Sequence, residues 1–517
     1  MTLRAGGMAW GEQLARAARR RPERAAVVHR GGTITYADLA ARMEQVAAGL
    51  AARGIGRGDR VALLMRNRPE FLEACLGALR LGAIVVPVNF RMVAAEVGFV
   101  LADSGARILL VDPPGSAVAA HAASAAPALG DVVTVEAEGA QGYASLPGAP
   151  LPEPPAVAES EPALIMYTSG TTGRPKGAVL SHQNLVMASV SALMAKGTGR
   201  DDEVIYLNLP LFHVGGLKMA LSALMCEASM VLVESGRFNA AEAVDDLERH
   251  GCTDCCFVGM QWREICALPG ISERRLALRR LAWGTQTADL ETLEAIRRTF
   301  PGIPVNVSFG QTEMAGLTCR LNGEDFERKR GSVGRPVPHV EARIVDDRMR
   351  DVAVGEVGEI VYRGPALMLG YWNLPEADAA AFAGDWFHSG DLCRFDEDGF
   401  VYVVDRITDT IVSGGENIYS AAVEEAIAGH PGVAEVAVIA APHPRWGESP
   451  LAVIVPRDAA HPPDLDDIVA HCRERIAAYR APTRLEVVDA LPRNASGKVV
   501  KPLLRERFVA AATQPVR

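Results

Sequence analysis

The sequence is poor in lysine, in long hydrophobic runs and in net positive charge. No apolar stretch reaches the ~18 residues that a membrane-spanning helix needs, and the arginine-rich residues 1–21 contain no central apolar block. We therefore expect neither an anchor nor a signal peptide, and a soluble cytoplasmic protein. The net charge of −10 leaves no basic excess to neutralise the phosphates of a duplex, which argues against a nucleic-acid partner.

Cysteine is sparse and irregularly placed. The nine cysteines of the 517-residue chain show no regular spacing, which is typical of buried free thiols in a reducing compartment. The alternative is a zinc site at His250, Cys252, Cys255 and Cys256. Because adjacent residues of a strand point to opposite faces, one tetrahedral site is disfavoured, and we expect core cysteines there.

Lysine supplies only six of the 53 basic residues. Arginine serves as the general surface cation, so a lysine inside a glycine-rich loop indicates a chemical role. Lysine is a compact, mobile charge that can follow a transferring group, whereas arginine is a rigid fork. Lys176 and Lys498 fit such a role. For Lys196, Lys218 and Lys329 the alternative, survival by chance, stays open.

The length of 517 residues predicts about three domain-sized units. Hydrophobic periodicity predicts an α/β protein. The first 110 residues alternate helical stretches with strands at 60–65 and 83–88. Residues 113–162, rich in alanine and proline, are interpreted as a loose connection. The alternation then resumes to about residue 310; its expected elements include a strand at 229–233 and a helix at 290–299.

The remainder of the chain predicts two smaller units. Residues 331–404 are dense in strands and turns and predict a β subdomain with strands at 341–345, 358–362 and 400–404. The last hundred residues predict a compact α+β unit. Its expected elements are a helix at 421–429, strands at 434–439 and 451–455, a helix at 465–477 and a basic terminal helix.

The run from Tyr167 to His182 combines glycines, hydroxyls and a lysine. Glycines let backbone N–H groups approach an anion, hydroxyls donate hydrogen bonds, and Lys176 adds a charge. Arg174 and Pro175 separate the second glycine from the lysine, so this is not a Walker loop. An ordinary turn is the alternative on composition alone. The candidate phosphate-binding residues are Thr168, Ser169, Gly170, Thr171, Thr172, Gly173 and Lys176.

Further motifs follow this run in a fixed order. They are Leu209–Gly216, Phe309–Met314, Trp386–Leu392, Asp405–Asp409 with Ser413–Asn417, and Pro492–Lys498. With these motifs the sequence closely resembles the adenylate-forming superfamily, specifically its acyl-CoA synthetases. The resemblance covers almost the whole chain, from about residue 10 to residue 505.

The resemblance implies a two-domain α/β enzyme. A large N-terminal domain, residues 1–404, would hold two α/β subdomains and the β subdomain. A hinge at residues 405–408 would lead to a small, mobile α+β C-terminal domain at residues 409–517. At the hinge this chain has Thr408 where the family usually has Asp or Lys, so domain rotation is expected to be tuned differently.

The implied activity is that of an ATP- and Mg²⁺-dependent acid:CoA ligase. It would join a carboxylate to ATP as an acyl-adenylate with release of pyrophosphate, then form the thioester with coenzyme A and release AMP. Fatty, aryl and branched acids all remain open, and so do a monomer and a homo-oligomer. The alternatives are transfer to the phosphopantetheine of a carrier protein, a luciferase-like adenylating oxygenase, and a binding protein without catalysis, which the complete set of motifs disfavours.

The resemblance also implies roles for catalytic residues. Glu313 would hold Mg²⁺ and Thr312 would contact the α-phosphate. Lys498 would bridge the acid's carboxylate and the phosphate, since adenylation brings two anions together and needs cations. His213 would lie beside the acyl carboxylate; a structural histidine is the alternative.

Nucleotide contacts are implied at three other points. Asp391 resembles the ribose anchor, because a carboxylate can accept from two vicinal hydroxyls, although a turn aspartate is the alternative. Arg406 resembles a second sugar contact. Phe309 replaces a common tyrosine and keeps the flat face for adenine. The nucleotide-binding set is completed by Ser308, Gly310 and Gln311.

The acid and the thiol would use separate segments. Gly215 and Gly216 would leave room for an acyl chain. A second substrate segment departs from the family's glycine, alanine and proline and consists of Gly284, Thr285 and Gln286. We expect Gln286 to hydrogen-bond the acid or the adenine edge. After rotation about the hinge, a hairpin would line a pantetheine channel with Ser413, Gly414, Gly415 and Glu416.

Overall fold

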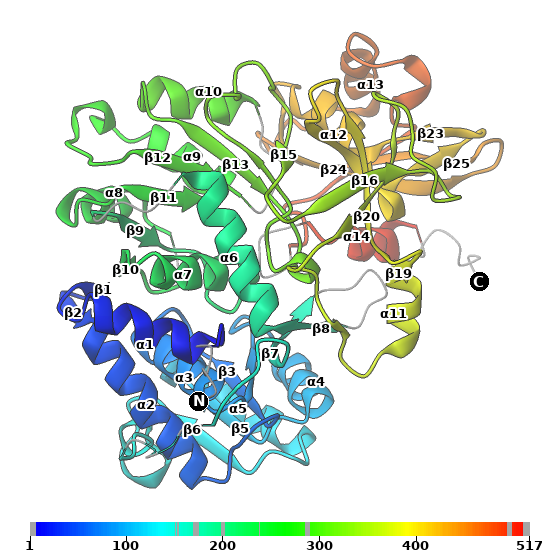
Figure 1. Ribbon diagram of the computed structural model, residues 1–517. Helices are drawn as coiled ribbons and strands as arrows, with labels where there is room; N and C mark the ends of the chain where they lie inside the picture. Colours follow the sequence, from blue (N-terminus) through cyan, green and yellow to red (C-terminus); the bar gives the residue numbers. More distant parts are fainter. Residues whose placement is uncertain are drawn as a thin grey trace. The chain divides into compact units, whose positions relative to one another are not determined.

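The computed structural model describes residues 7–149, 151, 153, 155–168, 175–197, 202–236, 238–284, 290–493 and 499–509. The chain divides into two compact units. The first comprises residues 1–342 with 362–387, and the second residues 343–361 with 388–517. Helices alternate with strands through most of the first unit, which bears out the predicted α/β alternation (Figure 1).

A nine-stranded sheet forms one half of the first unit. Its central strands are parallel, and β14, β15 and β2 are antiparallel to their neighbours. The strand order is β15 (Arg335–Pro336), β14 (Cys319–Leu321), β13 (Val305–Phe309), β12 (Arg280–Trp283), β11 (Asp254–Phe257), β9 (Val204–Leu207), β10 (Ser229–Leu232), β1 (Ala25–His29) and β2 (Gly32–Thr35). The helices of this part of the chain are α6 (His182–Lys196), α7 (Val214–Met225), α8 (Ala240–Arg249), α9 (Gly259–Cys266) and α10 (Leu290–Thr299).

A seven-stranded sheet forms the other half. Its order is β18 (Gly370–Tyr371), β8 (Lys176–Ser181), β7 (Pro162–Thr168), β4 (Ile84–Pro87), β3 (Arg60–Leu64), β5 (Ile108–Val111) and β6 (Asp131–Thr134). The accompanying helices are α1 (Trp10–Arg20), α2 (Tyr36–Ala52), α3 (Pro69–Arg80), α4 (Ala94–Ser104) and α5 (Ser116–Ala122). Strands β3 and β4 fall where the sequence predicted them.

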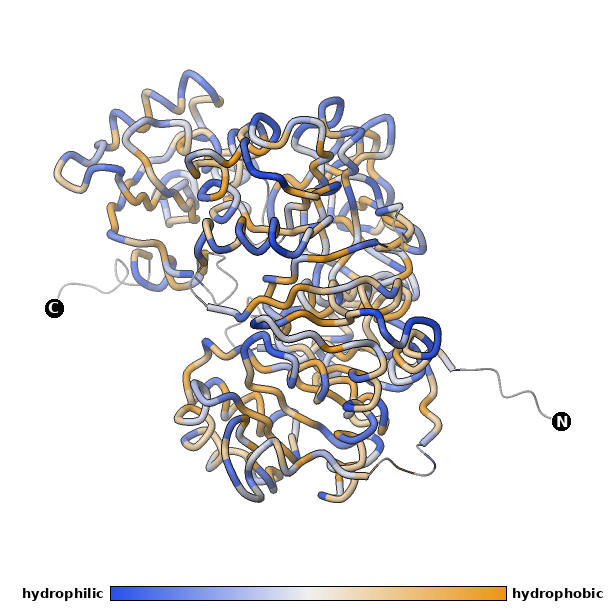
Figure 2. Tube along the Cα trace, turned by 90° about the vertical axis from the view of Figure 1, so that its left-hand side faces the viewer, coloured by the Kyte–Doolittle hydropathy of each residue, from blue (hydrophilic) through white to orange (hydrophobic). Residues whose placement is uncertain are grey.

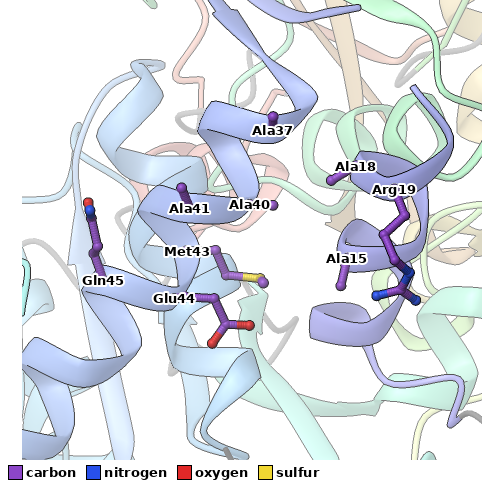
Figure 3. A pocket seen from close by; sticks show the side chains of 9 residues that line it. All are labelled: Ala15, Ala18, Arg19, Ala37, Ala40, Ala41, Met43, Glu44 and Gln45. Atoms are coloured by element: carbon purple, nitrogen blue, oxygen red, sulfur yellow. The ribbon is translucent and has the colours of Figure 1, made fainter. Parts of the chain in front are cut away.

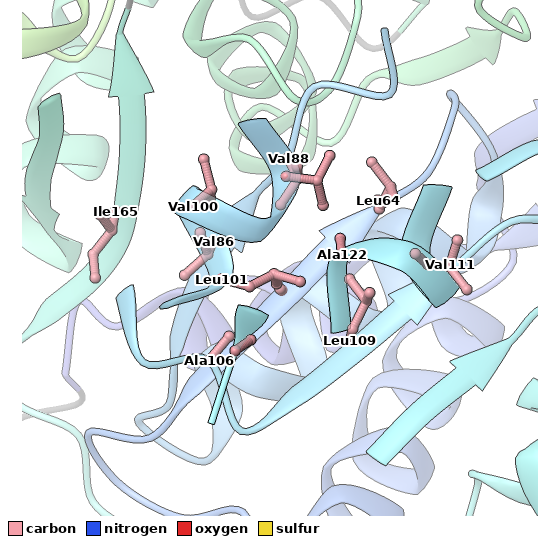
Figure 4. Packing of buried hydrophobic residues seen from close by; sticks show 14 of the residues in the cluster. Leu64, Val86, Val88, Val100, Leu101, Ala106, Leu109, Val111, Ala122 and Ile165 are labelled. Atoms are coloured by element: carbon pink, nitrogen blue, oxygen red, sulfur yellow. The ribbon is translucent and has the colours of Figure 1, made fainter. Parts of the chain in front are cut away.

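The core of this half is aliphatic. Strands β4 and β5 are buried along their whole length, as continuous hydrophobic parallel strands are when helices cover both faces. Leu64, Val86 and Leu109 pack with Val100 and Leu101 of α4 (Figure 4). In Figure 2 the strands carry the long hydrophobic stretches, while hydrophilic stretches lie mainly in turns and on helices.

The interpretation of residues 113–162 as a loose connection is wrong in part. Residues 116–122 form α5, and residues 131–134 form β6, which pairs in parallel with β5. Ala119 and Ala122 of α5 belong to the core cluster. Alanine-rich composition hides this packing, because alanine buries little area and gives a weak hydrophobic period.

Two further sheets follow. One has the order β16 (Glu341–Val345), β17 (Gly358–Arg363), β20 (Trp386–Phe395) and β19 (Phe382–Ala383), with β21 (Val401–Arg406) also pairing with β20, and α11 (Pro375–Ala381) precedes β19. The last has the order β23 (Glu416–Ile418), β22 (Ile411–Ser413), β25 (Gly447–Pro456) and β24 (Val433–His443), with β26 (Arg484–Val487) also pairing with β25. Its helices are α12 (Ser420–Ala428), α13 (Leu465–Arg473) and α14 (Lys501–Phe508).

The predicted elements of the C-terminal third are confirmed, with shifted ends. The strand predicted at 434–439 is the longer β24, and the helix predicted at 465–477 ends earlier, at Arg473. The long β24–β25 pair keeps an antiparallel register from Val433↔Pro456 to His443↔Gly447. Pairing with a neighbouring strand extends β24 beyond the residues whose hydrophobic pattern predicted it.

Candidate active site

The hairpin of β7 and β8 carries both ends of the predicted phosphate loop. Thr168 ends β7 and pairs with Lys176, the first residue of β8; the Thr168 Oγ1 donates to the Lys176 carbonyl at 3.5 Å. The loop residues Ser169, Gly170, Thr171, Thr172 and Gly173 lie outside the described residues. The antiparallel pair therefore fixes where the loop starts and where Lys176 stands.

A short segment ties this hairpin to the turn that carries Glu313. The N–H groups of Leu369 and Trp372 donate to the carbonyls of Val179 and Gly177 on β8, at 2.8 and 2.7 Å. The Met368 N–H donates to the Glu313 carbonyl at 2.8 Å. Backbone hydrogen bonds thus hold residues 368–372 between the loop hairpin and Glu313.

Tyr371 lies between the two predicted phosphate-side residues. Its hydroxyl donates to Glu313 Oε1 at 2.9 Å, and Lys176 Nζ lies 5.2 Å from the centroid of its ring. Tyr371 was not predicted from the sequence. A two-residue strand has no period to detect. The available signal was an aromatic pair, Tyr371 and Trp372, directly after Gly370, between the strands predicted at 358–362 and 400–404.

Glu313 occupies a tight turn at the end of β13. Residues Thr312–Met314 form one 3₁₀ turn, which the Gly316 N–H closes by donating to the Gln311 carbonyl at 2.9 Å. The Glu313 side chain is 9% exposed, and among the described residues its Oε2 has no hydrogen-bond partner. A buried carboxylate with one oxygen still available fits Mg²⁺, which takes one or two carboxylates and completes its shell with water and phosphate.

Other predicted nucleotide residues of this unit lie next to the same turn. Ser308 and Phe309 end β13, and the Phe309 carbonyl accepts from the Thr318 N–H at 2.8 Å. A Cβ on Gly310 would lie 2.6 Å from the Leu317 Cα. Gly310 is therefore required by the close approach of the returning chain, whatever else it contacts.

His213 begins helix α7. Its Nδ1 accepts from the Gly215 N–H at 3.2 Å, so the imidazole caps the helix and its ring is oriented. A Cβ on Gly215 would meet only this ring, at 3.4 Å, whereas a Cβ on Gly216 would lie 2.2 Å from the Pro210 carbonyl oxygen. Gly215 thus faces open space, while packing against Pro210 explains Gly216.

The predicted acid-side loop is only partly described. Gly284 follows β12, and a Cβ there would lie 3.8 Å from the Cys256 Sγ and 3.9 Å from the Ser308 carbonyl oxygen. Gly284 therefore sits at the carboxyl ends of adjacent parallel strands. Thr285 and Gln286 lie outside the described residues.

In the second unit, Asp391 and Arg406 face each other across β20 and β21. They are register partners, and Arg406 Nε donates to Asp391 Oδ1 at 2.9 Å. Asp391 is 4% exposed, and its N–H donates to the Ser389 hydroxyl at 3.0 Å. Asp391 is thus a buried strand residue held by a guanidinium, in contrast to the turn alternative.

The residues beside the predicted hinge form a buried polar network. Asp405 accepts from the Arg406 N–H at 2.8 Å and from the Ser420 hydroxyl at 3.1 Å. Lys501 donates to the same hydroxyl at 2.7 Å and lies 2.8 Å from Glu424. Burial raises the pKa of both Asp405 and Glu424.

The turn that contains Thr408 is held from α14. Arg505 donates to the Thr408 carbonyl at 3.0 Å and to the Asp409 carboxylate at 2.6 Å. Lys498 lies outside the described residues; on either side of its segment, Arg493 and Val499 form an antiparallel bridge. The ends of the Lys498 segment are therefore brought together.

Residues Ser413–Glu416 form a β-hairpin with a two-residue turn, and a hairpin was predicted here. Ser413 and Glu416 are register partners, and Gly414 and Gly415 have φ of +60° and +89°. Two consecutive positive φ values are those of a type I′ turn, which explains the glycines. The Gly414 N–H donates to the carbonyl of the exposed Trp446 at 2.8 Å.

A surface hollow in the first unit is lined by residues between positions 15 and 45, which contain none of the predicted motifs. It lies between α1 and α2 and is lined largely by alanines, with Met43 and Glu44 projecting from α2 and Arg19 on α1 (Figure 3). None of the sequence-predicted site residues lines it. Its lining offers no nucleophile or paired acid and base.

Two composition-based expectations can be compared with the structure. All nine cysteines are free thiols; Cys255 is buried on β11 and the adjacent Cys256 is half-buried. No helix within the described part of the chain is long and apolar enough to cross a membrane.

Comparison with known proteins gives the family. The profile of the AMP-binding enzyme family matches residues 14–372, and that of the AMP-binding enzyme C-terminal domain matches residues 422–498. Feruloyl-CoA synthase of an Amycolatopsis species is 38% identical over 495 residues, which is 95% of this chain and 98% of that protein. The 2-succinylbenzoate–CoA ligase of Geobacillus kaustophilus is 37% identical over 93% of this chain and 94% of its own length.

Solved structures agree. The o-succinylbenzoate CoA synthetase MenE of Bacillus subtilis, bound to its acyl-adenylate intermediate, superposes with a TM-score of 0.85 at 32% identity and covers 95% of this chain and 97% of its own. ATP-bound MatB of Rhodopseudomonas palustris gives 0.89 at 30% identity over 97% and 99% of the two chains. The predicted fold, a large N-terminal domain and a smaller C-terminal one, is confirmed. The chain belongs to the AMP-binding enzyme family and, within that adenylate-forming superfamily, to its acid–CoA ligases, which use ATP, Mg²⁺ and coenzyme A.

Proposed function

We propose that this ligase activates its acid beside Glu313 and completes the thioester with the Ser413–Glu416 hairpin. The observation that carries the proposal is the row Lys176, Tyr371, Glu313, built at the mouth of the predicted phosphate loop. A cation lies over one aromatic ring, and a carboxylate accepts from the hydroxyl of the same ring. A nucleoside triphosphate with its metal needs a cation for the phosphates and a carboxylate for the metal.

The phosphate side of the site follows from these contacts. Lys176, Thr168 and the loop residues 169–173 would bind the phosphates, and Thr312, next to Glu313, the α-phosphate. Bound Mg²⁺ would supply charge neutralisation between the phosphates. Tyr371 donates to one oxygen of Glu313, which orients the carboxylate and leaves the second oxygen for the metal. Lys498 would bridge the acid's carboxylate and the phosphate.

The ribose would contact Asp391, and the adenine would contact Phe309. Asp391, with its charge offset by Arg406, is suited to accept from ribose hydroxyls. Phe309 would stack on adenine, with Ser308, Gly310 and Gln311 beside it. These assignments rest on the motifs and on the burial of Asp391.

The acid would lie along the start of α7. His213, oriented by its cap to Gly215, would face the carboxylate, and Gly215 would leave space for the chain. Gly284, Thr285 and Gln286 would form the opposite wall, with Gln286 donating or accepting a hydrogen bond. For Gly216 the contact with Pro210 is the stronger explanation.

Residues 1–404 would act as the N-terminal domain, 405–408 as the hinge and 409–517 as the mobile C-terminal domain. Rotation would withdraw Lys498 and bring the glycine hairpin to the pantetheine arm. The network of Asp405, Ser420 and Lys501 supports a hinge at this point, because it anchors the chain firmly on one side of Arg406. A cytoplasmic location is supported by the nine free cysteines.

A second acceptor has one observation in its favour. A fatty acid–[acyl-carrier-protein] ligase of Streptomyces coeruleorubidus is 34% identical over 95% of each chain. The names of other relatives, feruloyl-CoA synthase and indoleacetate–CoA ligase, support coenzyme A and an acid that bears a ring. Coenzyme A is therefore the proposed acceptor.

The experiment is pyrophosphate release from ATP and Mg²⁺ over a panel of aliphatic and aromatic acids, with coenzyme A, with a phosphopantetheinylated carrier, or with neither. We expect release that depends on one class of acid and turns over only with coenzyme A. Turnover with the carrier alone would show that the acceptor is a carrier protein and not coenzyme A. No release with any acid would contradict the proposed function.

The role of Lys498 in adenylation can be tested separately from thioester formation. Lys498→Ala should abolish formation of the acyl-adenylate but leave thioester formation from a supplied acyl-adenylate, because the lysine acts only where two anions meet. Lys501→Ala, which removes a neighbouring lysine that the hinge network holds, is the matched variant and should not show this split. Equal loss of both half-reactions in Lys498→Ala would refute its assignment.

A further inference from the structure

Helix α7 carries a polar stripe beyond His213. Gly215, Lys218 and Ser222 are spaced by three and four residues and share one face of the helix. Lys218 is half-buried, and the Ser222 hydroxyl is buried without a hydrogen-bond partner among the described residues. The helix packs against α6 and against β9 and β10 (Figure 1). The stripe thus leads from the capping imidazole into the interior of the unit.

The charges around this stripe do not balance. Two buried carboxylates, Glu203 and Asp254, are already paired: Arg280 lies 2.7 Å from Glu203 and 3.1 Å from Asp254. Lys196, at the end of α6, lies 3.5 Å from Asp254. These two carboxylates and two cations neutralise one another.

Two further cations form no ion pair within the described part of the chain, and the charge of Asp254 also acts on the first of them, Arg320. Arg320, 6% exposed, donates to neutral groups, Asn322 Oδ1 at 2.9 Å and Ser308 Oγ at 3.4 Å. Lys218 forms no ion pair or hydrogen bond within the described part of the chain, and the groups that act on it electrostatically are Lys196, Arg320 and Cys256. Burying a cation without a counter-charge is costly.

The pKa of Lys218 reflects this cost of burial. Burial, with the charges of Lys196 and Arg320, lowers the pKa of Lys218 to about 7. The one group that acts in the opposite direction is Cys256, and burial raises the pKa of that thiol to about 11, so it carries no charge at neutral pH. An oxyanion at this place would restore the charge of Lys218.

The cluster adjoins the residues assigned to the acid. Cys256 Sγ lies 3.8 Å from where a Cβ of Gly284 would stand, and Gly215 of the stripe faces open space. From His213 to Lys218 the helix rises roughly 7.5 Å at five residues of 1.5 Å. A group bound by Lys218 would therefore be remote from the carboxylate that reacts.

We propose that the acid used by this enzyme carries a second oxyanion, remote from the reacting carboxylate, and that Lys218 binds it. This inference rests on the proposed function, since it concerns the same acid. A second carboxylate pairs with the Lys218 ammonium directly, and an aryl hydroxyl gives the same oxygen–ammonium contact when its proton passes to the Lys218 amine. Lys218 is the specificity-determining residue, and Arg320 adds to the positive field.

The test compares matched acids in wild type and in Lys218→Met, which has a side chain of similar length without charge. One arm uses para-hydroxycinnamic acid against cinnamic and para-methoxycinnamic acids; the other uses octanedioic acid against octanoic acid. In wild type we expect the acid with the second carboxylate or the aryl hydroxyl to be preferred in kcat/KM by roughly 10- to 150-fold in one arm, the range of a charge-assisted hydrogen bond. The arm that shows the preference identifies the source of the oxyanion.

In Lys218→Met the preference should vanish, chiefly through a higher KM for the acid, because a remote contact binds ground and transition states alike. Lys218→Arg should retain much of it. Lys196→Met is the comparison variant: it removes an equal charge beside Asp254 but keeps Lys218. Because the charge of Lys196 lowers the pKa of Lys218, its removal favours the charged form of Lys218, and the preference should persist.

The outcomes separate the two claims. Equal use of the matched acids in both arms, or a preference that survives in Lys218→Met, overturns the inference and leaves the ligase assignment intact. Pyrophosphate release with none of the acids, across this panel and the wider one, counts against the ligase assignment itself. Thermal melting of each variant shows whether it is folded.

Discussion

Glu313 and Asp391 are both buried carboxylates of the candidate site, but their partners differ. Glu313, in the first unit, is held by a neutral phenol, that of Tyr371, at 2.9 Å. Asp391, in the second unit, is held by the guanidinium of Arg406 at the same distance. A phenol leaves the charge of its carboxylate intact, whereas a guanidinium offsets it. The first arrangement suits a metal cation, and the second suits neutral hydroxyl groups.

The manner of positioning differs as well. The Glu313 turn is fixed by backbone contacts, among them the Met368 N–H and the close approach of Leu317 to Gly310. Asp391 is fixed by strand pairing and by side chains. A metal ligand has to be placed within tenths of an ångström, and backbone hydrogen bonds achieve this with less lost side-chain entropy.

The largest effect is expected from Glu313→Gln. The amide keeps the shape and can still accept from Tyr371, but it removes the charge offered to Mg²⁺. Adenylation should fall by roughly 10²- to 10⁴-fold, since such charge stabilisation contributes several kcal/mol. Radiolabelled ATP–pyrophosphate exchange measures it. The exposed Glu324 provides the matched control, Glu324→Gln, and a similar loss there would remove the distinction.

How far the sequence predicted these features depends on the kind of signal. Glu313, Asp391 and the glycine hairpin lie in motifs with a fixed order, and helix α10 begins and ends at the predicted residues. Tyr371 could not be found in this way, because its function depends on two residues distant in sequence, Lys176 and Glu313.

Two other features were hidden for physical reasons. The strand β6 was missed because alanine and proline around it dilute the hydrophobic pattern. The packing reason for Gly216 was invisible because a close approach of backbone to backbone leaves no mark in the sequence beyond the glycine itself. The charge imbalance at Lys218 likewise appears only when α6, α7 and the strands are brought together.

A smaller effect is expected from Asp391→Asn. Its amide can accept only through one oxygen and leaves Arg406 without its counter-charge, so the affinity for ATP should fall. We expect a rise of roughly 10- to 100-fold in the KM for ATP, in line with the loss of a charge-assisted hydrogen bond. The control is Asp347→Asn at an exposed position. An unchanged KM for ATP would show that Asp391 does not contact the nucleotide.

The smallest effect is expected from Tyr371→Phe. The ring beside Lys176 stays, and the hydrogen bond to Glu313 is lost. Adenylation should fall by roughly 3- to 10-fold, the value of one ordinary hydrogen bond with its orienting effect. Initial rates at saturating ATP, with Mg²⁺ varied, measure this. A loss as large as that of Glu313→Gln would mean that the hydroxyl contacts substrate directly.

The central claim is that Glu313, and not Asp391, offers its charge to the metal. The most direct measurement is the Mg²⁺ concentration at half-maximal ATP–pyrophosphate exchange, at fixed free ATP, in wild type, Glu313→Gln and Asp391→Asn. We predict a higher Mg²⁺ requirement in Glu313→Gln alone, with that of Asp391→Asn equal to wild type. An equal shift in both variants, or a shift in Asp391→Asn only, would contradict it.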